Sequence, residues 1–221
     1  MAALFAALPA LASEIAPVAT VLSSAASFAN SAKNIASKPA AGPKDSLKND
    51  KNRWLVCTVK NMTDFPVLVM AHYSNSGRYD DPPERIEPFS TMTFTCCEKD
   101  NSFMTGATGG QAFYINVDHG HQFYFGVGYC NPTMGSTKAG AYKASADEVK
   151  DIQSDKKDAQ TKVAEKAYDA ASEEGNKIES DYYRAKDEEG KDVVFQFEVS
   201  ASAGQKTVYT ISEVRDYRTV V

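Results

Sequence analysis

Apolar and polar side chains alternate with a period of two over most of residues 54–142, which is the pattern of strands with one buried face. Clusters of Gly, Pro, Asn and Asp separate the successive runs and predict turns between them. Residues 192–214 return to the same alternation around Gly204 and predict a closing hairpin. The pattern predicts a mainly β fold, an antiparallel β-sandwich flanked by helices.

The N-terminal residues 13–37 follow a helical period instead. One face of the predicted helix is apolar and built from small side chains, namely Ile15, Val18, Leu22, Ala25, Ala26, Ala29, Ala32 and Ala36. The opposite face carries Ser, Thr and Asn in place of the usual Lys and Glu. Two interpretations follow: a helix that covers a sheet, or a segment that can leave its docking site and enter a membrane.

Residues 143–190 are dense in Asp, Glu and Lys and contain a thin apolar seam of Val149, Ile152, Ala159, Val163, Ala167 and Ala170. The seam predicts a largely exposed helix, which packs on an edge of the sheet or forms a protein-binding coiled coil. Gly175 and Asn176 should break this helix, so a shorter second helix is expected toward Tyr182 and Tyr183.

Residues 38–52 contain two prolines and a glycine without apolar periodicity, which indicates a hinge or linker. The chain is therefore expected to have three parts. These are an amphipathic segment over 1–37, a linker over 38–52 and a β-sandwich domain over 53–221 with a helical insertion at 143–190.

Composition narrows the function. The 221 residues are 43% apolar, enough for a substantial core. The formal net charge of −5 argues against a general nucleic-acid binder and against purely electrostatic attraction to anionic lipid. No run of about 18 strongly apolar residues occurs, so the chain is expected to be made as a soluble protein with at most a conditional membrane role.

Localisation and redox state stay open at this stage. Residues 1–12 are apolar and could be a signal peptide cleaved before Ser13. They lack the positively charged start of a secretory signal, however, and contain Pro9. The four cysteines have no metal-ligand spacing. Ordinary thiols are the first interpretation, and a disulfide from Cys57 to Cys96 or Cys97 is the second.

Catalytic chemistry is not indicated. The three histidines, His72, His119 and His121, show no spacing typical of a Ser-His-Asp or Cys-His pair. Asp118 beside His119 and His121 is a weak surface metal site at best. We predict no enzyme activity, no metal and no cofactor.

Short motifs along the sandwich carry a family resemblance. They are Asn61-x-Thr63, Tyr73-x-x-Ser76-Gly77, Pro82-Pro83, Ala107-Thr108-Gly109, Phe125-Gly126-Val127 and Ser202-Ala203-Gly204. In this order they resemble the actinoporins, pore-forming cytolysins of sea anemones, over about residues 54–142 and 193–213. The resemblance implies a secreted or released monomer that binds sphingomyelin in a target membrane, inserts its N-terminal helix and oligomerises into a pore.

The resemblance also implies site residues. The phosphocholine headgroup would contact Ser76, Tyr129, Tyr182 and Tyr183, and the pore helix would present Ile15, Val18, Leu22, Ala25, Ala29 and Ala32. A helix over residues 13–37 would be about 37 Å long, enough for a hydrocarbon core of roughly 30 Å. The family's Phe-Ser-Val-Pro run reads Phe-Gly-Val-Gly at 125–128, and Met134 is the large apolar residue left in the expected membrane loop.

A second resemblance gives the alternative function. Residues 125–129 and the closing hairpin are also similar to the fungal fruit-body lectins, which use the same sandwich to bind glycans. Those lectins have no pore helix. The partner is therefore expected to be a membrane lipid, or a glycan bound without pore formation.

Overall fold

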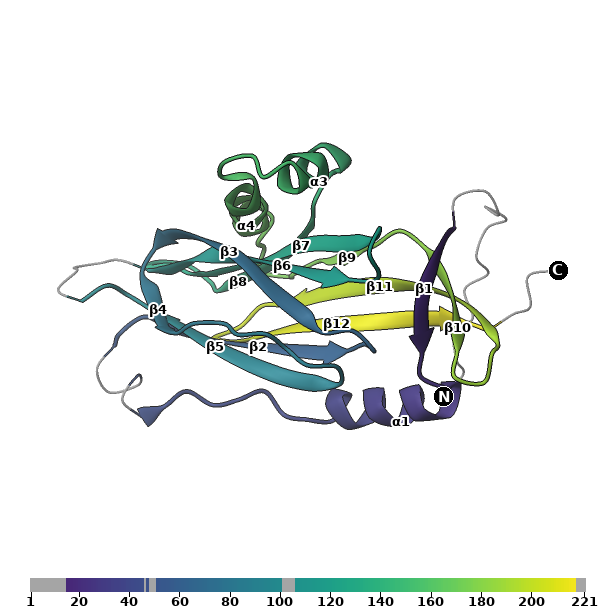
Figure 1. Ribbon diagram of the computed structural model, residues 1–221. Helices are drawn as coiled ribbons and strands as arrows, with labels where there is room; N and C mark the ends of the chain where they lie inside the picture. Colours follow the sequence, from purple (N-terminus) through teal and green to yellow (C-terminus); the bar gives the residue numbers. More distant parts are fainter. Residues whose placement is uncertain (1–14, 46, 48–50, 101–105, 218–221) are drawn as a thin grey trace.

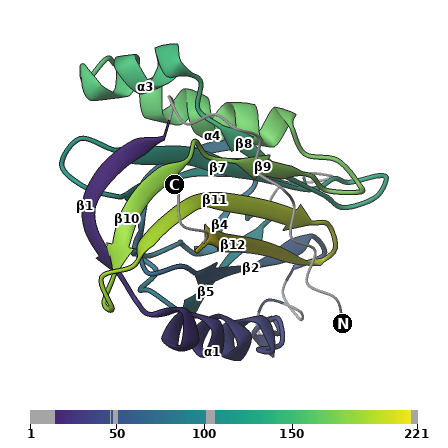
Figure 2. The same ribbon diagram turned by 90° about the vertical axis from the view of Figure 1, so that its right-hand side faces the viewer.

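Two β-sheets pack face to face in the computed structural model, which describes residues 15–45, 47, 51–100 and 106–217 (Figure 1). Sheet A has eight strands in the order β1-β10-β11-β12-β2-β5-β4, with β9 also paired to β11. Sheet B has four strands in the order β3-β6-β7-β8. Helix α1 lies outside sheet A, and α3 and α4 lie outside sheet B (Figures 1 and 2).

The elements of the first half are β1 Ala16–Leu22, α1 Ala25–Ala36, β2 Trp54–Met62, β3 Val67–Ser76, β4 Arg78–Asp81, β5 Ser90–Cys97 and β6 Ala107–Asn116. Those of the second half are β7 Gln122–Asn131, β8 Lys138–Lys143, α3 Ala146–Gln153, α4 Ala159–Asp169, β9 Lys177–Glu179, β10 Tyr183–Asp187, β11 Asp192–Ser202 and β12 Lys206–Asp216.

The core lies between the sheets and is rich in aromatic rings. The side chains of Phe94, Phe113, Phe125, Phe195 and Phe197 are each at most 1% exposed. The Tyr209 hydroxyl crosses the interface and donates to the Gly128 carbonyl at 2.6 Å. The β-sandwich prediction is confirmed, although two strand pairs, β1 with β10 and β12 with β2, run parallel.

The N-terminal segment is not one helix, and this corrects the sequence prediction. Residues 13 and 14 lie outside the described residues. From Ala16 to Leu22 the chain is strand β1, which pairs in parallel with β10, and only Ala25–Ala36 is helical. Of the expected pore-helix residues, Ile15 precedes β1, Val18 and Leu22 lie in β1, and the three alanines lie in α1: Ala25, Ala29 and Ala32.

The types of side chain explain why this segment forms a strand followed by a helix. Pro17 lacks the N–H that a continuous helix requires, and β-branched Val18, Thr20 and Val21 favour extended backbone. Within α1, the side that faces the domain carries Phe28, Ser31, Ala32 and Ile35. The predicted alanine stripe is therefore mostly turned away from the sandwich, with Ala25 and Ala29 exposed.

A buried ionic cluster holds the junction between β1 and α1. Ser23 donates its backbone N–H and its hydroxyl to the Asp64 carboxylate at 2.7 and 2.8 Å, and its carbonyl accepts from Arg215 Nη1 at 2.6 Å. Arg215 also pairs with Asp64 and Glu213 and lies 3.9 Å from the centre of the Phe28 ring. We call Asp64, Glu213 and Arg215 the Arg215 cluster.

The expected linker is docked on the sandwich where it is described. The Lys60 ammonium on β2 donates to the carbonyls of Ala36 and Lys38 at 2.9 and 2.6 Å, and the Ala41 N–H donates to the Thr58 hydroxyl. Leu47 is buried. The connection from α1 to β2 therefore follows the outer face of sheet A.

The charged insertion packs on the outer face of sheet B. Its predicted apolar seam is the contact surface, since Ile152, Ala159, Val163 and Ala167 are buried. The predicted second helix toward Tyr182 is wrong, because β9 and β10 occupy that stretch and pair with β11.

Helix α4 lies directly against glycines of sheet B. A methyl group built on Gly110 would come within 1.9 Å of the Ala164 carbonyl oxygen, and one on Gly128 within 1.9 Å of the Ala167 carbonyl oxygen. The glycines at 110, 126, 128 and 140 therefore permit the close approach of a helix backbone to the sheet.

Candidate functional site

The chain crosses from sheet B to sheet A at Gly77, between β3 and β4, at the open side of the sandwich. Gly77 has φ of +86°, and a methyl group there would lie 2.5 Å from the Cys97 carbonyl oxygen. Only glycine fits this turn without strain. A pocket lies beside this crossing.

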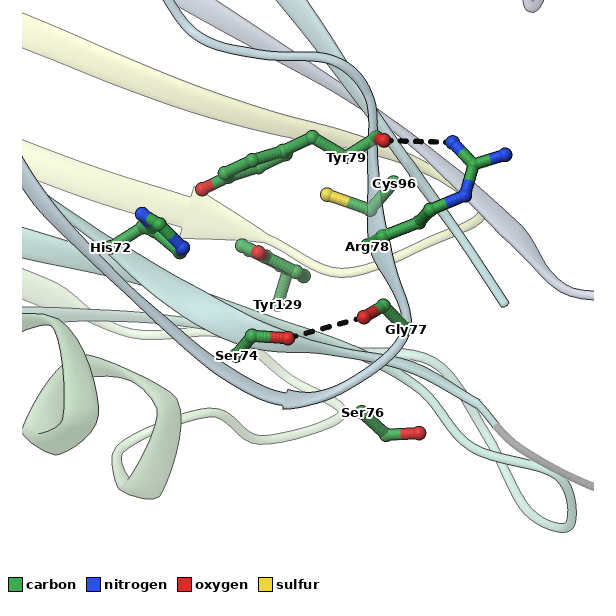
Figure 3. A pocket seen from close by; sticks show the side chains of 8 residues that line it. All are labelled: His72, Ser74, Ser76, Gly77, Arg78, Tyr79, Cys96 and Tyr129. Atoms are coloured by element: carbon green, nitrogen blue, oxygen red, sulfur yellow. Dashed lines mark hydrogen bonds between the residues drawn. The ribbon is translucent and has the colours of Figure 1, made fainter. Parts of the chain in front are cut away.

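The pocket has a volume of about 230 Å³, and we call it the crossover pocket (Figure 3). Aromatic rings from three strands surround it: the Tyr79 ring centroid lies 5.5 Å from that of His72 and 6.4 Å from that of Tyr129. The lining residues are His72, Ser74, Ser76, Gly77, Arg78, Tyr79, Cys96 and Tyr129.

Polar groups line the side nearest the Gly77 turn. The Ser74 hydroxyl donates to the Gly77 carbonyl at 3.2 Å, and the Ser76 hydroxyl donates to the Gly106 carbonyl at 3.1 Å. Arg78 donates to the Tyr79 carbonyl and pairs with Asp100 at 3.2 Å. The pocket thus has an aromatic side and a side of hydroxyls and a guanidinium.

The deep groups of the pocket stay protonated at neutral pH. Burial raises the pKa of the Tyr79 and Tyr129 hydroxyls and of the Cys96 thiol well above their usual ranges. The Tyr79 hydroxyl donates to Gln111 Oε1 at 2.9 Å. A neutral, buried thiol is a poor nucleophile, so these groups suit binding better than catalysis.

Positive side chains gather at the end of the sandwich that carries the crossover pocket. The register of the strands places the start of β2, β8 and β12 and the end of β5 at this end. The cations there are Lys51, Arg53, Arg78, Lys138 and Lys206. Acidic residues lie among them, since Glu98 and Asp100 follow β5 and Asp100 pairs with both Lys51 and Arg78.

The structure brings together two of the four predicted headgroup residues. Ser76 and Tyr129 both line the crossover pocket. Tyr182 and Tyr183 lie at the other end of the molecule, where Tyr183 is 5% exposed and packs against Phe195 with ring centroids 5.4 Å apart. Residues 177–187 follow β11, and this pairing separates the two tyrosines from Ser76.

Met134, the residue predicted to contact the membrane, lies in an exposed loop. Met134 lies between β7 and β8, at the same end as the crossover pocket, and is 82% exposed. The neighbouring Thr133 carbonyl accepts from Arg53 Nη2 at 2.6 Å. Met134 is therefore a large apolar side chain presented to solvent, in a loop that Arg53 contacts.

No family model matches the chain, and no curated protein matches it. One similar solved structure is described as that of the lipid binding protein Nakanori. It is 10% identical, the TM-score is 0.43, and the alignment covers 85% of this chain and 79% of that chain. A likeness at this distance does not transfer the ligand of that protein to this chain.

The sequence analysis did not predict five lining residues of the crossover pocket as site residues: His72, Ser74, Arg78, Tyr79 and Cys96. Four of these, all except Cys96, lie within four residues of Ser76 in the sequence. The signal was their proximity in sequence to Ser76. The four cysteines are free thiols, and the described residues contain no cluster of metal-binding side chains.

Proposed function

We propose that this chain is a membrane-binding protein whose crossover pocket takes the headgroup of a choline phospholipid such as sphingomyelin. One observation carries the proposal: three aromatic rings line a single pocket together with hydroxyl groups and a guanidinium, contributed by His72, Tyr79, Tyr129, Ser74, Ser76 and Arg78. Met134 and the lysine and arginine side chains named above lie at the same end of the sandwich as the pocket and would face the lipid.

The two sides of the pocket match the two charges of phosphocholine. Tyrosine rings attract a quaternary ammonium through their π-faces. Arg78 and the serine hydroxyls can donate to phosphate oxygens, and a guanidinium is suited to this role because it donates in a planar fork. The proposal thus assigns the ammonium to Tyr79 and Tyr129, and the phosphate to the Gly77 side.

Replacing Tyr79 by leucine should weaken binding to sphingomyelin vesicles about ten-fold, since one cation–π contact contributes about 0.5–2 kcal/mol. Tyr79→Phe keeps the ring and should bind within about three-fold of the unchanged chain. Vesicle co-sedimentation measures both affinities.

Tyr114→Leu is the matched control, because Tyr114 is a half-buried tyrosine that stacks on Tyr124 away from the pocket. Equal binding by Tyr79→Leu and the unchanged chain would refute the headgroup assignment. So would equal binding to vesicles with ethanolamine in place of choline headgroups.

The proposal includes a second step, in which the N-terminal segment enters the membrane. In the described residues no helix is long and apolar enough to cross a membrane. If β1 left β10 and joined α1, a helix over residues 16–36 would be about 31 Å long, close to the hydrocarbon thickness. Several copies would supply such helices to line a pore with their Ser, Thr and Asn side chains.

Locking β1 to β10 should block leakage while sparing binding. Val21 and Lys186 are exposed register partners, so Val21→Cys with Lys186→Cys can form a disulfide across the pair. We expect the oxidised double variant to release less than about one tenth of the calcein released by the reduced form. The single variants are the controls.

Undiminished leakage from the oxidised double variant would contradict the N-terminal step. An absence of leakage from the unchanged chain would also refute that step, while leaving the headgroup assignment to its own test.

A further inference from the structure

The crossover pocket contains a side chain of the type that ordinarily changes its charge between about pH 5 and 8, the imidazole of His72. This ring is exposed to solvent and meets the Tyr79 ring edge-on, at 5.5 Å between centroids. Its register partner on β6 is Gln111, which does not titrate. The charge of the pocket therefore depends on His72 over this range of pH.

The other lining groups keep their charge over the same range. Burial keeps the two tyrosine hydroxyls and the Cys96 thiol protonated, because it raises the pKa of each. The Arg78 guanidinium stays positive. The lining residues, all of which the structure describes, include no carboxylate. A proton on His72 thus adds a positive charge that no acidic side chain of the pocket neutralises.

Charged groups outside the pocket have partners of their own. Asp80 accepts from the Thr95 hydroxyl at 3.4 Å, and Asp100 pairs with Arg78 at 3.2 Å. On the outer face of sheet B, Tyr168 of α4 lies against Tyr73. The loop between α3 and α4 lies beside Ala71 and carries two charges of each sign, namely Asp155, Lys156, Lys157 and Asp158.

His72 lies on the side of the pocket to which the ammonium is assigned. Figure 3 shows its ring near Tyr79 and Tyr129, across the pocket from Arg78. Both tyrosine rings are held by the buried Phe94, at 5.9 and 5.7 Å between centroids. A quaternary ammonium within about 6 Å of these rings is a neighbour of the imidazole. Two positive charges this close repel each other, and more strongly where the ligand displaces water.

We infer that His72 makes headgroup binding depend on pH, so that the crossover pocket takes a choline headgroup when the imidazole is neutral and releases it in acid. This inference rests on the proposed function, because it concerns the same ligand in the same pocket. The neutral ring leaves the ammonium to the tyrosine π-faces, whereas the imidazolium places a like charge beside it. The phosphate lies toward Gly77 and Arg78, so its attraction to His72 is the weaker effect.

Co-sedimentation of the full chain with sphingomyelin vesicles at about pH 7.5 and about pH 5.5 tests this inference. The phosphodiester and the quaternary ammonium of the lipid do not titrate in this range. Because the apparent affinity scales with the fraction of competent molecules, the unchanged chain should bind about ten-fold more weakly at the lower pH. His72→Gln takes up no proton, so its two affinities should agree within about two-fold.

His119→Gln is the matched control, because His119 is an exposed histidine in the turn between β6 and β7, outside the pocket. This variant should keep the full pH dependence. Glu213, whose pKa is about 7, also titrates in this range. Both variants retain Glu213, so a pH dependence caused by that residue would persist in His72→Gln.

Three results would overturn the inference and leave the headgroup assignment in place. They are equal affinity of the unchanged chain at the two pH values, a pH dependence that persists in His72→Gln, and tighter binding at the lower pH. The last result would place the phosphate beside His72. An absence of binding at about pH 7.5 would instead refute the proposed function, and this inference with it.

Discussion

Replacing Arg215 by alanine should lower the free energy of unfolding by about 3–5 kcal/mol, the usual cost of leaving buried charges without their partner. The Arg215 side chain is 2% exposed and lies between Asp64 and the fully buried Glu213. Urea denaturation followed by circular dichroism measures the loss. Because Arg215 also holds Ser23 and Phe28, amides of α1 should exchange with solvent faster in the variant.

The control is Arg85→Ala, which breaks an exposed pair with Glu87 and should cost no more than about 1 kcal/mol. Similar losses for Arg215→Ala and Arg85→Ala would show that the Arg215 cluster does not stabilise the fold.

The cost of removing Arg215 should also depend on pH. Burial raises the pKa of Glu213 from 4.5 to about 7, while Arg215 opposes the rise. A raised carboxyl pKa means that ionisation of Glu213 destabilises the folded state as the pH increases toward 7. Without Arg215 the pKa rises further, so the variant should lose more stability at about pH 8 than at about pH 5.5.

Replacing Gly128 by alanine should lower the free energy of unfolding by about 3 kcal/mol and loosen α4. The added methyl group would lie 1.9 Å from the Ala167 carbonyl oxygen and 2.4 Å from its carbon, so backbone must move. Urea denaturation gives the loss, and hydrogen exchange of α4 amides locates it.

Gly42→Ala is the matched control, because a methyl group at this exposed glycine meets nothing within 4 Å. Its stability should stay within about 0.5 kcal/mol of the unchanged chain. If Gly128→Ala were equally stable, the close contact between α4 and sheet B would not constrain the sequence.

The glycine contacts also explain why residues 125–128 differ from the run found in the resembling family. Residues 125–128 read Phe-Gly-Val-Gly where the resembling family has Phe-Ser-Val-Pro. The structure shows that Gly126 and Gly128 lie beneath α4, with Val163 and Ala167 directly above them. Packing accounts for these two residues, and no ligand is needed to explain them.

The strands of the sandwich were predictable because each buries one face, and this gives the sequence an apolar–polar alternation with a period of two. The predictions that were wrong concern segments whose conformation depends on pairing with strands distant in sequence. Residues 16–22 fit the apolar period of the predicted helix, yet Pro17, the β-branched side chains and pairing with β10 make them a strand. Residues 177–187 are rich in Lys, Glu and Asp, and pairing with β11, together with the pairing of β10 with β1, holds them extended.

The family resemblance implied four headgroup residues, and two of them lie together. Ser76 and Tyr129 belong to β3 and β7, which both pair with β6, so the fold brings them to one pocket. Tyr182 and Tyr183 follow the charged insertion, whose path depends on how α4 packs and where β9 pairs. The sequence contains no periodic signal for that path.

Strand β1 also covers an edge of β10 that could otherwise pair with another copy of the protein. It is the edge strand of sheet A. If β1 separates from β10, the backbone N–H and C=O groups on that side of β10 lose their hydrogen-bond partners. An exposed sheet edge of this kind can pair with a strand of another molecule, which joins the sheets of two copies edge to edge. The outward charge of Lys186 on β10 discourages such joining in water. Strand β1 thus keeps the β10 edge of sheet A paired within the molecule.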